Sequence, residues 1–285
     1  MQISILVATY NNIDYLKLFI NSIEKNSFFK HEMLIHVNDG SDGTLEYVKK
    51  KKYKFTHSEK NIGLCKSINL ISNNVTSDHI LYSHDDMFFC KNWDLYLANE
   101  IKKMKNNKYY LAGTNVSVDK GLINYDCGST YTDFNENKFN LFCKMDKSKD
   151  LQSSHWSPHL IHKDLWNEVG GFSEEFNPGD ASDPDLCMKL WKNNVRIFKC
   201  VSRFKVYHFN SVTTRKSNVT LNNGTKTFIL KYGINPRFFR KYFLRGDILR
   251  EYKGELSEPS YSIQMIIDIV KNKLKYFYFK MINIR

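Results

Sequence analysis

The sequence predicts an α/β fold in which a mainly parallel, mixed sheet is flanked by helices. Short apolar segments rich in β-branched residues alternate with segments of helical periodicity, and polar clusters follow several of the apolar segments. Strands that alternate with helices of this length pair mostly in parallel, because each helix carries the chain back across one face of the sheet. At 285 residues, of which 42% are apolar, the chain can bury one large core or two modest ones.

The first hundred residues contain four predicted strand and helix units. We expect the strands at residues 3–8, 33–37, 53–57 and 80–83. We expect the helices that follow them over 13–23, 45–48, 63–73 and 94–105, the first of them capped by Asn12. Ligands bind outside the carboxyl ends of strands in such sheets. The polar clusters after strands one, two and four should therefore converge on one crevice.

The second half of the chain has a less regular pattern. Residues 109–118 and 195–206 are typical of strands, a helix should precede residue 169, and another should begin at the acids near residue 183. Residues 119–152 are polar, with no clear period, and no element is assigned there. We expect a catalytic domain over residues 1–235 and a basic, amphipathic extension over residues 236–285.

A helix is expected from Ile263 onward. Its polar residues Gln264, Asp268, Lys271, Asn272 and Lys275 fall on one face, and apolar residues fill the rest. This pattern is typical of a helix that lies in a membrane interface. It equally fits a helix that packs on the protein's own core or on a partner, and the sequence leaves both interpretations open.

Charge and cysteine usage limit the partners. The net charge of +12 favours phosphates, nucleic acid or an anionic membrane surface, but the lysine run at 49–52 is typical of a solvated helix end, so no nucleic acid is expected. Six scattered cysteines without a C-x-x-C pair predict neither a zinc site nor a disulfide framework. With no signal segment and no 18-residue apolar run, we expect a cytoplasmic protein at or near a membrane.

Two adjacent carboxylates, Asp85 and Asp86, end the fourth predicted strand. Like charges at the end of a buried strand cost free energy unless a cation or hydrogen-bond donors satisfy them. A divalent metal is one interpretation, and a loop with solvated acids is the other.

Five motifs in order resemble the inverting family 2 glycosyltransferases, which have the GT-A fold. They are Ile5-Leu6-Val7-Ala8-Thr9-Tyr10-Asn11, Val37-Asn38-Asp39-Gly40-Ser41-Asp42-Gly43-Thr44, Asn61-Ile62-Gly63 with Asn69, His84-Asp85-Asp86 and Gly170-Gly171-Phe172-Ser173-Glu174. The ordered set spans residues 3–210. One such motif alone is weak evidence, whereas five at fitting spacing are strong.

The resemblance implies a nucleotide pocket. Its residues would be Thr9, Tyr10, Asn11, Asp39, Asn61, Gly63 and Asp85. Tyr10 would stack on the base or ribose, and Asp39 would accept the imide N–H of uracil. This role favours a uridine or thymidine donor, and a UDP-sugar is expected first. The alternative for Asp39 is a turn-forming role before Gly40. Asn38 and the shortened Ser41-Asp42 step depart from the family pattern.

The resemblance also implies a metal site and a base. Asp86 would bind Mn²⁺ or Mg²⁺ with His84 and His208, while Asp85 would reach the ribose or a bound water. Asp183, with Asp185 as second choice, would take the acceptor's proton, although Ser182 replaces the usual acid before it and both could simply stabilise a helix N-terminus. Trp156 would bind the acceptor sugar or simply pack.

The expected function is metal-dependent, inverting transfer of a sugar from a nucleotide-diphosphate donor to a hydroxyl of a saccharide or lipid-linked acceptor in surface-glycan synthesis. Two alternatives stay open. A sugar-phosphate nucleotidyltransferase would need a Gly-rich, basic phosphate loop after the first strand, which Thr9-Tyr10-Asn11-Asn12 is not. A non-catalytic module that binds polyanions or membranes would depend on the positive charge alone.

Overall fold

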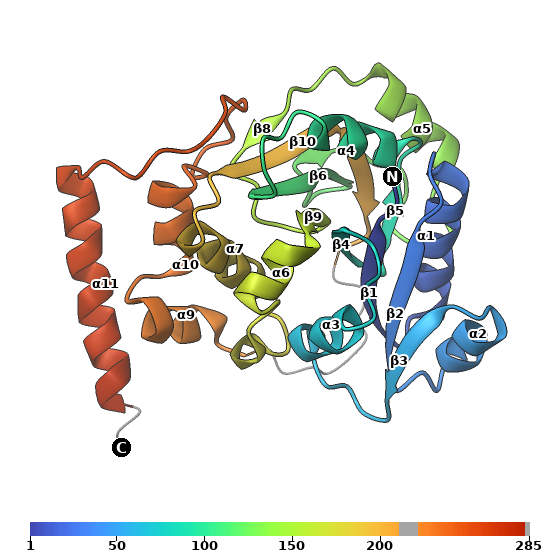
Figure 1. Ribbon diagram of the computed structural model, residues 1–285, viewed down its shortest axis with the longest axis horizontal. Helices are drawn as coiled ribbons and strands as arrows, with labels where there is room; N and C mark the ends of the chain where they lie inside the picture. The colour runs from blue at the N-terminus through green and yellow to red at the C-terminus, as the bar shows by residue number, and fades with distance from the viewer. Residues whose placement is uncertain (211–221, 283–285) are drawn as a thin grey trace.

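The computed structural model describes residues 1–210 and 222–282 (Figure 1). Its strands are β1 Ser4–Tyr10, β2 Glu32–Asn38, β3 Lys54–Ser58, β4 His79–His84, β5 Met87–Phe89, β6 Tyr109–Ser117, β7 Ile123–Asn124, β8 Leu151–Gln152, β9 His159–His162 and β10 Ile197–His208. Its helices are α1 Ile13–Asn26, α2 Thr44–Lys50, α3 Leu64–Ser72, α4 Trp93–Ile101, α5 Glu136–Met145, α6 Lys163–Val169, η1 Glu174–Phe176, α7 Ser182–Lys192, α9 Gly224–Tyr232, α10 Pro236–Phe238, η2 Phe239–Phe243 and α11 Ile263–Ile282.

In the described residues the strands form one ten-stranded sheet. The order across it is β3-β2-β1-β4-β9-β6-β10-β5, with β7 beside β6 and β8 beside β10. The pairs among β1, β2, β3 and β4 are parallel, as is β6 with β10. In contrast, β9 runs antiparallel between β4 and β6, and β5 runs antiparallel to β10. The predicted mixed α/β class is confirmed.

Helices cover both faces of the sheet because the central strands are apolar on both sides. In β1, Ile5 and Val7 belong to the core beneath α1, α4 and α5, whereas Leu6 points into the core beneath α3, α6 and α7. This alternation follows from the two-residue period of a strand. Figure 1 shows the sheet enclosed between these helices.

The structure corrects two expectations about local elements. Residues 119–152, to which no element was assigned, contain β7, α5 and β8. Asn12 occupies the N-cap position of α1 but makes no capping hydrogen bond with its side chain. The backbone N–H of Ile13 instead donates to Asp42 Oδ2, at 2.9 Å, from the loop after β2. The first helix is therefore capped from a neighbouring loop, which leaves the Asn12 side chain available at the sheet edge.

The C-terminal residues pack on the rest of the chain. Phe239, Leu244 and Leu256 are buried in the second core, together with residues of α7 and β6. Helix α11 lies alongside α9 at the edge of the molecule (Figure 1). The division into a domain over 1–235 and an extension over 236–285 stays a prediction, and the extension is not detached in the described structure.

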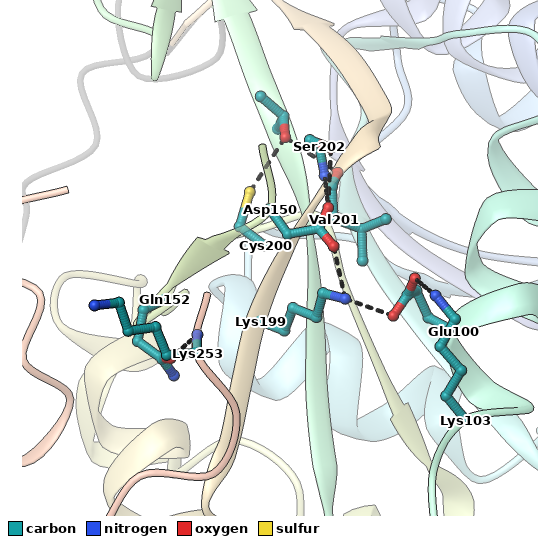
Figure 2. Close-up of polar contacts among 10 residues, drawn as sticks. Glu100, Lys103, Asp150, Gln152, Lys199, Cys200, Val201, Ser202 and Lys253 are labelled. Carbon is teal, nitrogen blue, oxygen red and sulfur yellow. Dashed lines mark hydrogen bonds and ion pairs between the residues drawn. The ribbon is translucent and has the colours of Figure 1, made fainter. Parts of the chain in front are cut away.

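A buried lysine on β10 joins three segments of the chain. Lys199 Nζ on β10 lies 2.6 Å from Glu100 Oε2 on α4 and 2.6 Å from Asp150 Oδ2 before β8 (Figure 2). Asp150 Oδ1 also accepts hydrogen bonds from the backbone N–H and the hydroxyl of Ser202. The Lys199 side chain is only 7% exposed, so its charge is compensated by these two carboxylates rather than by water.

Replacing Lys199 with alanine is expected to destabilise the fold. Glu100 would keep only Lys103 as a charged partner, and Asp150 would lose its charged partner. Removing one member of a buried ion pair lowers the free energy of unfolding by about 3 kcal/mol or more. We expect a loss near the lower limit of about 3 kcal/mol here, because Asp150 is partly exposed. Urea unfolding monitored by circular dichroism measures this loss. Lys103→Ala is the matched control, since its exposed ammonium should contribute about 0.5 kcal/mol, and equal losses in both variants would contradict the account.

Candidate active site

Four strands end at one edge of the sheet and bring their following residues together. Tyr10 ends β1, Asn38 ends β2, His84 ends β4 and His208 ends β10. Register pairs Tyr10 with Asn38 and Ala8 with His84, so the loops after these strands lie side by side. The predicted convergence of the polar clusters is confirmed for the described residues.

The loops after β1 and β2 are joined by side-chain hydrogen bonds. Asn11 Nδ2 donates to Asp39 Oδ2 at 2.9 Å, and Asn11 Oδ1 accepts from the backbone N–H of Gly40 at 2.9 Å. The backbone N–H of Ser41 donates to the other Asp39 oxygen at 3.1 Å. These hydrogen bonds, that of Asn11 first, lower the pKa of Asp39. Asp39 is therefore a fixed, ionised acceptor at the sheet edge, next to Tyr10.

The loop before α3 contacts Asn38, the last residue of β2. Asn38 Oδ1 accepts from the backbone N–H of Ile62, and Asn61 Oδ1 accepts from that of Gly63, both at 2.9 Å. Gly63 has φ +82°, and a Cβ atom there would lie 2.6 Å from Asn177 Oδ1. Only glycine therefore fits this turn. Of the two predicted pocket residues here, Gly63 is buried and shapes the loop, whereas Asn61 is exposed.

His84, Asp86 and His208 form a compact group. One ligand atom from each lies within 4.8 Å of the others, and His208 Nε2 is 3.2 Å from Asp86 Oδ1. The pairing of β10 with β5 explains this arrangement, because it sets His208 opposite Met87, next to Asp86. Among the described residues this is the one group of at least three such side chains close enough to hold a metal.

The chemistry of the three side chains fits a divalent cation. Burial, and then the charge of His208, lowers the pKa of His84 to about 4, so its imidazole is neutral and able to coordinate. Ser157 Oγ contacts His84 Nε2 at 3.0 Å and orients the ring. His208 Nε2 makes no hydrogen bond of proper geometry. Two imidazoles and a carboxylate form a mixed nitrogen and oxygen set that can hold a divalent cation.

The Asp85 side chain has different neighbours from that of Asp86. It is buried, its nearest side-chain donors are Thr9 and Asn12, and its Oδ2 has no hydrogen-bond partner. Burial and the neighbouring charge of Asp86 raise the pKa of Asp85. Thr9 is thus buried against Asp85 rather than open in the pocket. The sequence did not indicate Asn12 as a neighbour of this carboxylate.

Asp183 and Asp185 both lie in the first turn of α7 but differ in their contacts. Asp183 Oδ1 is enclosed without a hydrogen-bond partner, and burial raises the pKa of Asp183 to about 7. Asp185 is fully buried, and its Oδ1 accepts from Tyr232 Oη at 2.7 Å and lies 2.9 Å from Lys231 Nζ. Each acid thus has one oxygen without a hydrogen-bond partner, but only Asp185 is engaged in an ion pair, whereas the pKa of Asp183 lies near neutral pH.

Tyr82 lies near the carboxylates of both Asp85-Asp86 and Asp183. Its hydroxyl is buried without a hydrogen-bond partner, and besides burial its pKa is raised by the charges of Asp183, Asp86 and Asp85. Tyr82 is therefore within electrostatic range of all three carboxylates. Neither Tyr82 nor Ser157 was predicted as a site residue. Tyr82 lies on β4, two residues before His84, whereas Ser157 reaches His84 from the loop before β9, which pairs antiparallel with β4.

Trp156 lies in the loop between β8 and β9 and is half-buried. Its indole N–H donates to the carbonyl of Gly113 at 2.9 Å, and its own carbonyl accepts from Tyr110 Oη. These contacts fix the ring while leaving part of it exposed.

The comparison with protein families decides the class of protein. Residues 4–166 match the model of glycosyl transferase family 2, which is more than half of the chain. The chain belongs to glycosyl transferase family 2. The matched region includes Asp39, His84 and Asp86, whereas Asp183 and His208 lie beyond its end. A search of curated proteins finds no match.

Solved structures of glycosyltransferases share the fold. TarS of S. aureus, residues 1–349, in complex with UDP-GlcNAc is 16% identical, with a TM-score of 0.59 over 98% of this chain and 73% of TarS. Its complex with UDP is 20% identical, with a TM-score of 0.55 over 73% of this chain and 60% of TarS. GalNAc-T7 with UDP, GalNAc and Mn²⁺ is 12% identical, with a TM-score of 0.59 over 98% and 56%. At these identities the likeness establishes the GT-A fold of this family 2 chain.

Proposed function

We propose that this family 2 protein is a metal-dependent, inverting glycosyltransferase. It would transfer a sugar from a nucleotide-diphosphate donor, with a UDP-sugar favoured, to a hydroxyl of a saccharide or lipid-linked acceptor in surface-glycan synthesis. The observation that carries the proposal is the group of His84, Asp86 and His208 at the same sheet edge as Asp39. Family membership supports the sugar-transfer reaction over a nucleotidyltransferase or a non-catalytic module.

Each group has one chemical task. Asp39 accepts the uracil imide N–H, and Tyr10 lies beside it, next to the base or ribose. His84, Asp86 and His208 would hold a divalent cation, Mn²⁺ or Mg²⁺, which would supply positive charge to compensate the negative charge of the departing diphosphate. Asp183 takes the proton of the acceptor hydroxyl as its oxygen bonds to the anomeric carbon. The bond from that carbon to the diphosphate breaks, so the configuration inverts in one displacement.

The nucleotide specificity can be tested by thermal shift. We expect uridine diphosphate with Mn²⁺ to raise the melting temperature more than cytidine diphosphate does, because cytosine lacks the imide proton that Asp39 accepts. Asp39→Ala should weaken uridine diphosphate binding about tenfold or more and remove the preference over cytidine diphosphate. Glu46→Ala, an exposed acid on the next helix, is the control. A preference that persists in Asp39→Ala would contradict this role.

The rate should depend on pH through Asp183. The base must be ionised, and burial raises its pKa to about 7, so protonation removes the base as the pH falls through 7. We expect kcat to fall about tenfold per pH unit below that value and to level off above it. A pH profile of nucleoside diphosphate release under saturating donor measures this. Asp185→Asn should keep the same inflection, and an inflection lost in Asp185→Asn but kept in Asp183→Asn would assign the base to Asp185.

A further inference from the structure

Helix α11 is attached to the protein by one face. Met265 and Asn272 are buried on this face, and Asn272 Oδ1 accepts from the backbone N–H of Asn235 at 2.8 Å. Asp268 accepts a hydrogen bond from Tyr242 Oη at 2.7 Å and lies 3.1 Å from Lys241 Nζ. Asp268 and Asn272, two of the polar residues that share one face of the helix, therefore point toward the protein. The helix is held in a fixed orientation.

The opposite face of α11 is apolar and exposed. Its members recur every three or four residues and are between 43% and 79% exposed: Ile263, Ile266, Ile267, Val270, Leu274, Phe277, Tyr278, Met281 and Ile282. At 100° per residue most of them form one stripe along the helix, roughly 30 Å long for 20 residues. We call this set the α11 stripe. A contiguous apolar surface of this length that is exposed to solvent marks an interaction site.

Lysines flank the α11 stripe on both sides. Lys271 and Lys275 lie along one edge of it, and Lys273 and Lys280 lie along the other, as their spacing requires. All four are exposed, and the single acid in α11, Asp268, is on the attached face. The exposed side of the helix is thus apolar in the middle and positive at both margins.

This charge pattern identifies the occupant. A second copy of the helix would bury the stripe but bring lysine margins against lysine margins, and like charges oppose that pairing. An anionic lipid surface would receive the apolar side chains among its acyl chains and pair the lysines with its head groups. No helix in the described residues is long and apolar enough to cross a bilayer.

We propose that the α11 stripe docks the protein on an anionic lipid surface, with α11 lying in the plane of the interface. The attached face of α11 then fixes the orientation of the catalytic domain relative to that surface. This proposal does not rest on the proposed sugar transfer. If both hold, the acceptor side of the reaction is confined to the neighbourhood of the membrane.

Vesicle sedimentation of the full chain tests the proposal. We expect the protein to sediment with phosphatidylcholine vesicles that contain about one third phosphatidylglycerol, and much less with phosphatidylcholine alone or at high salt. The triple variant Val270→Ser, Leu274→Ser and Phe277→Ser should lose at least tenfold in partitioning. Lys273→Ala with Lys275→Ala should lose about 30-fold on the anionic vesicles.

The control replaces exposed apolar residues elsewhere. Leu141→Ser with Met145→Ser, on α5, should bind anionic vesicles as the wild type does. Because the replaced stripe residues are exposed, melting temperatures should match among all variants. Equal sedimentation of the triple variant and the wild type would overturn the proposal. So would a concentration-dependent dimer in light scattering that the triple variant abolishes without any vesicle binding. Turnover of a soluble donor and acceptor is measured separately, so failure of lipid binding leaves the proposed reaction untouched.

Discussion

Asp86→Ala is expected to abolish metal-dependent turnover, with kcat/KM reduced about 10³-fold or more. Asp86 is the only carboxylate in the group with His84 and His208, so its loss leaves two imidazoles and no negative charge to hold a divalent cation. Without the cation, the charge that develops on the departing diphosphate is not compensated. Nucleoside diphosphate release measures turnover, and calorimetric titration with Mn²⁺ measures binding.

The fold of the Asp86→Ala variant should be intact. Removing Asp86 relieves the charge repulsion that contributes to the raised pKa of Asp85 but also removes the contact with His208, so we expect only a small change in melting temperature. Asp78→Ala is the control, because Asp78 is an exposed acid at the opposite end of β4. Full metal-dependent turnover in Asp86→Ala would contradict the assignment of this site.

Asp183→Asn is expected to lower kcat about 10²- to 10⁴-fold with little change in KM for the donor. The amide cannot accept the acceptor's proton, but it has nearly the same shape as the carboxylate and leaves the nucleotide loops unchanged. Steady-state kinetics with donor and acceptor varied separately distinguish these effects. Binding of the donor nucleotide should match that of the wild type.

Asp185→Asn gives the matched comparison for this prediction. Asp185 accepts from Tyr232 and pairs with Lys231, which ties α7 to α9. Its loss should lower the free energy of unfolding by about 3 kcal/mol. The accompanying change in kcat should be much smaller than that of Asp183→Asn. A large loss of kcat in Asp185→Asn with a normal rate in Asp183→Asn would reverse the two roles.

The first half of the fold was predictable because its apolar residues are periodic. The strands β1, β2 and β4 and the helices α1 and α3 each bury several residues at the spacing of a strand or helix, and this is the pattern that sequence analysis detects. Helix α5 was missed because Phe139 is its single buried residue. Phe142 and Cys143 are only partly buried, and Leu141 and Met145 are exposed, so the apolar residues do not mark one clear face.

The site was predictable where it depends on residues next to strand ends. Asp39, Asp86 and His208 follow or end strands, and parallel pairing brings such ends to one edge. The contact of Ser157 with His84 was not predictable, because it depends on β9 entering the sheet antiparallel to β4. For α11 the sequence indicated the amphipathic pattern but not its direction. Asp268 and Asn272 point inward because Tyr242 and Asn235 satisfy their polar groups there.

The most direct test of the central claim is the dependence of nucleotide binding on a divalent cation. Calorimetric titration of the wild-type chain with uridine diphosphate should give a binding isotherm with Mn²⁺ present. The affinity should fall sharply after chelation, return when Mn²⁺ is restored, and stay low in Asp86→Ala. Equal affinity with and without the cation, in both the wild type and the variant, would contradict a metal-dependent donor site formed by His84, Asp86 and His208.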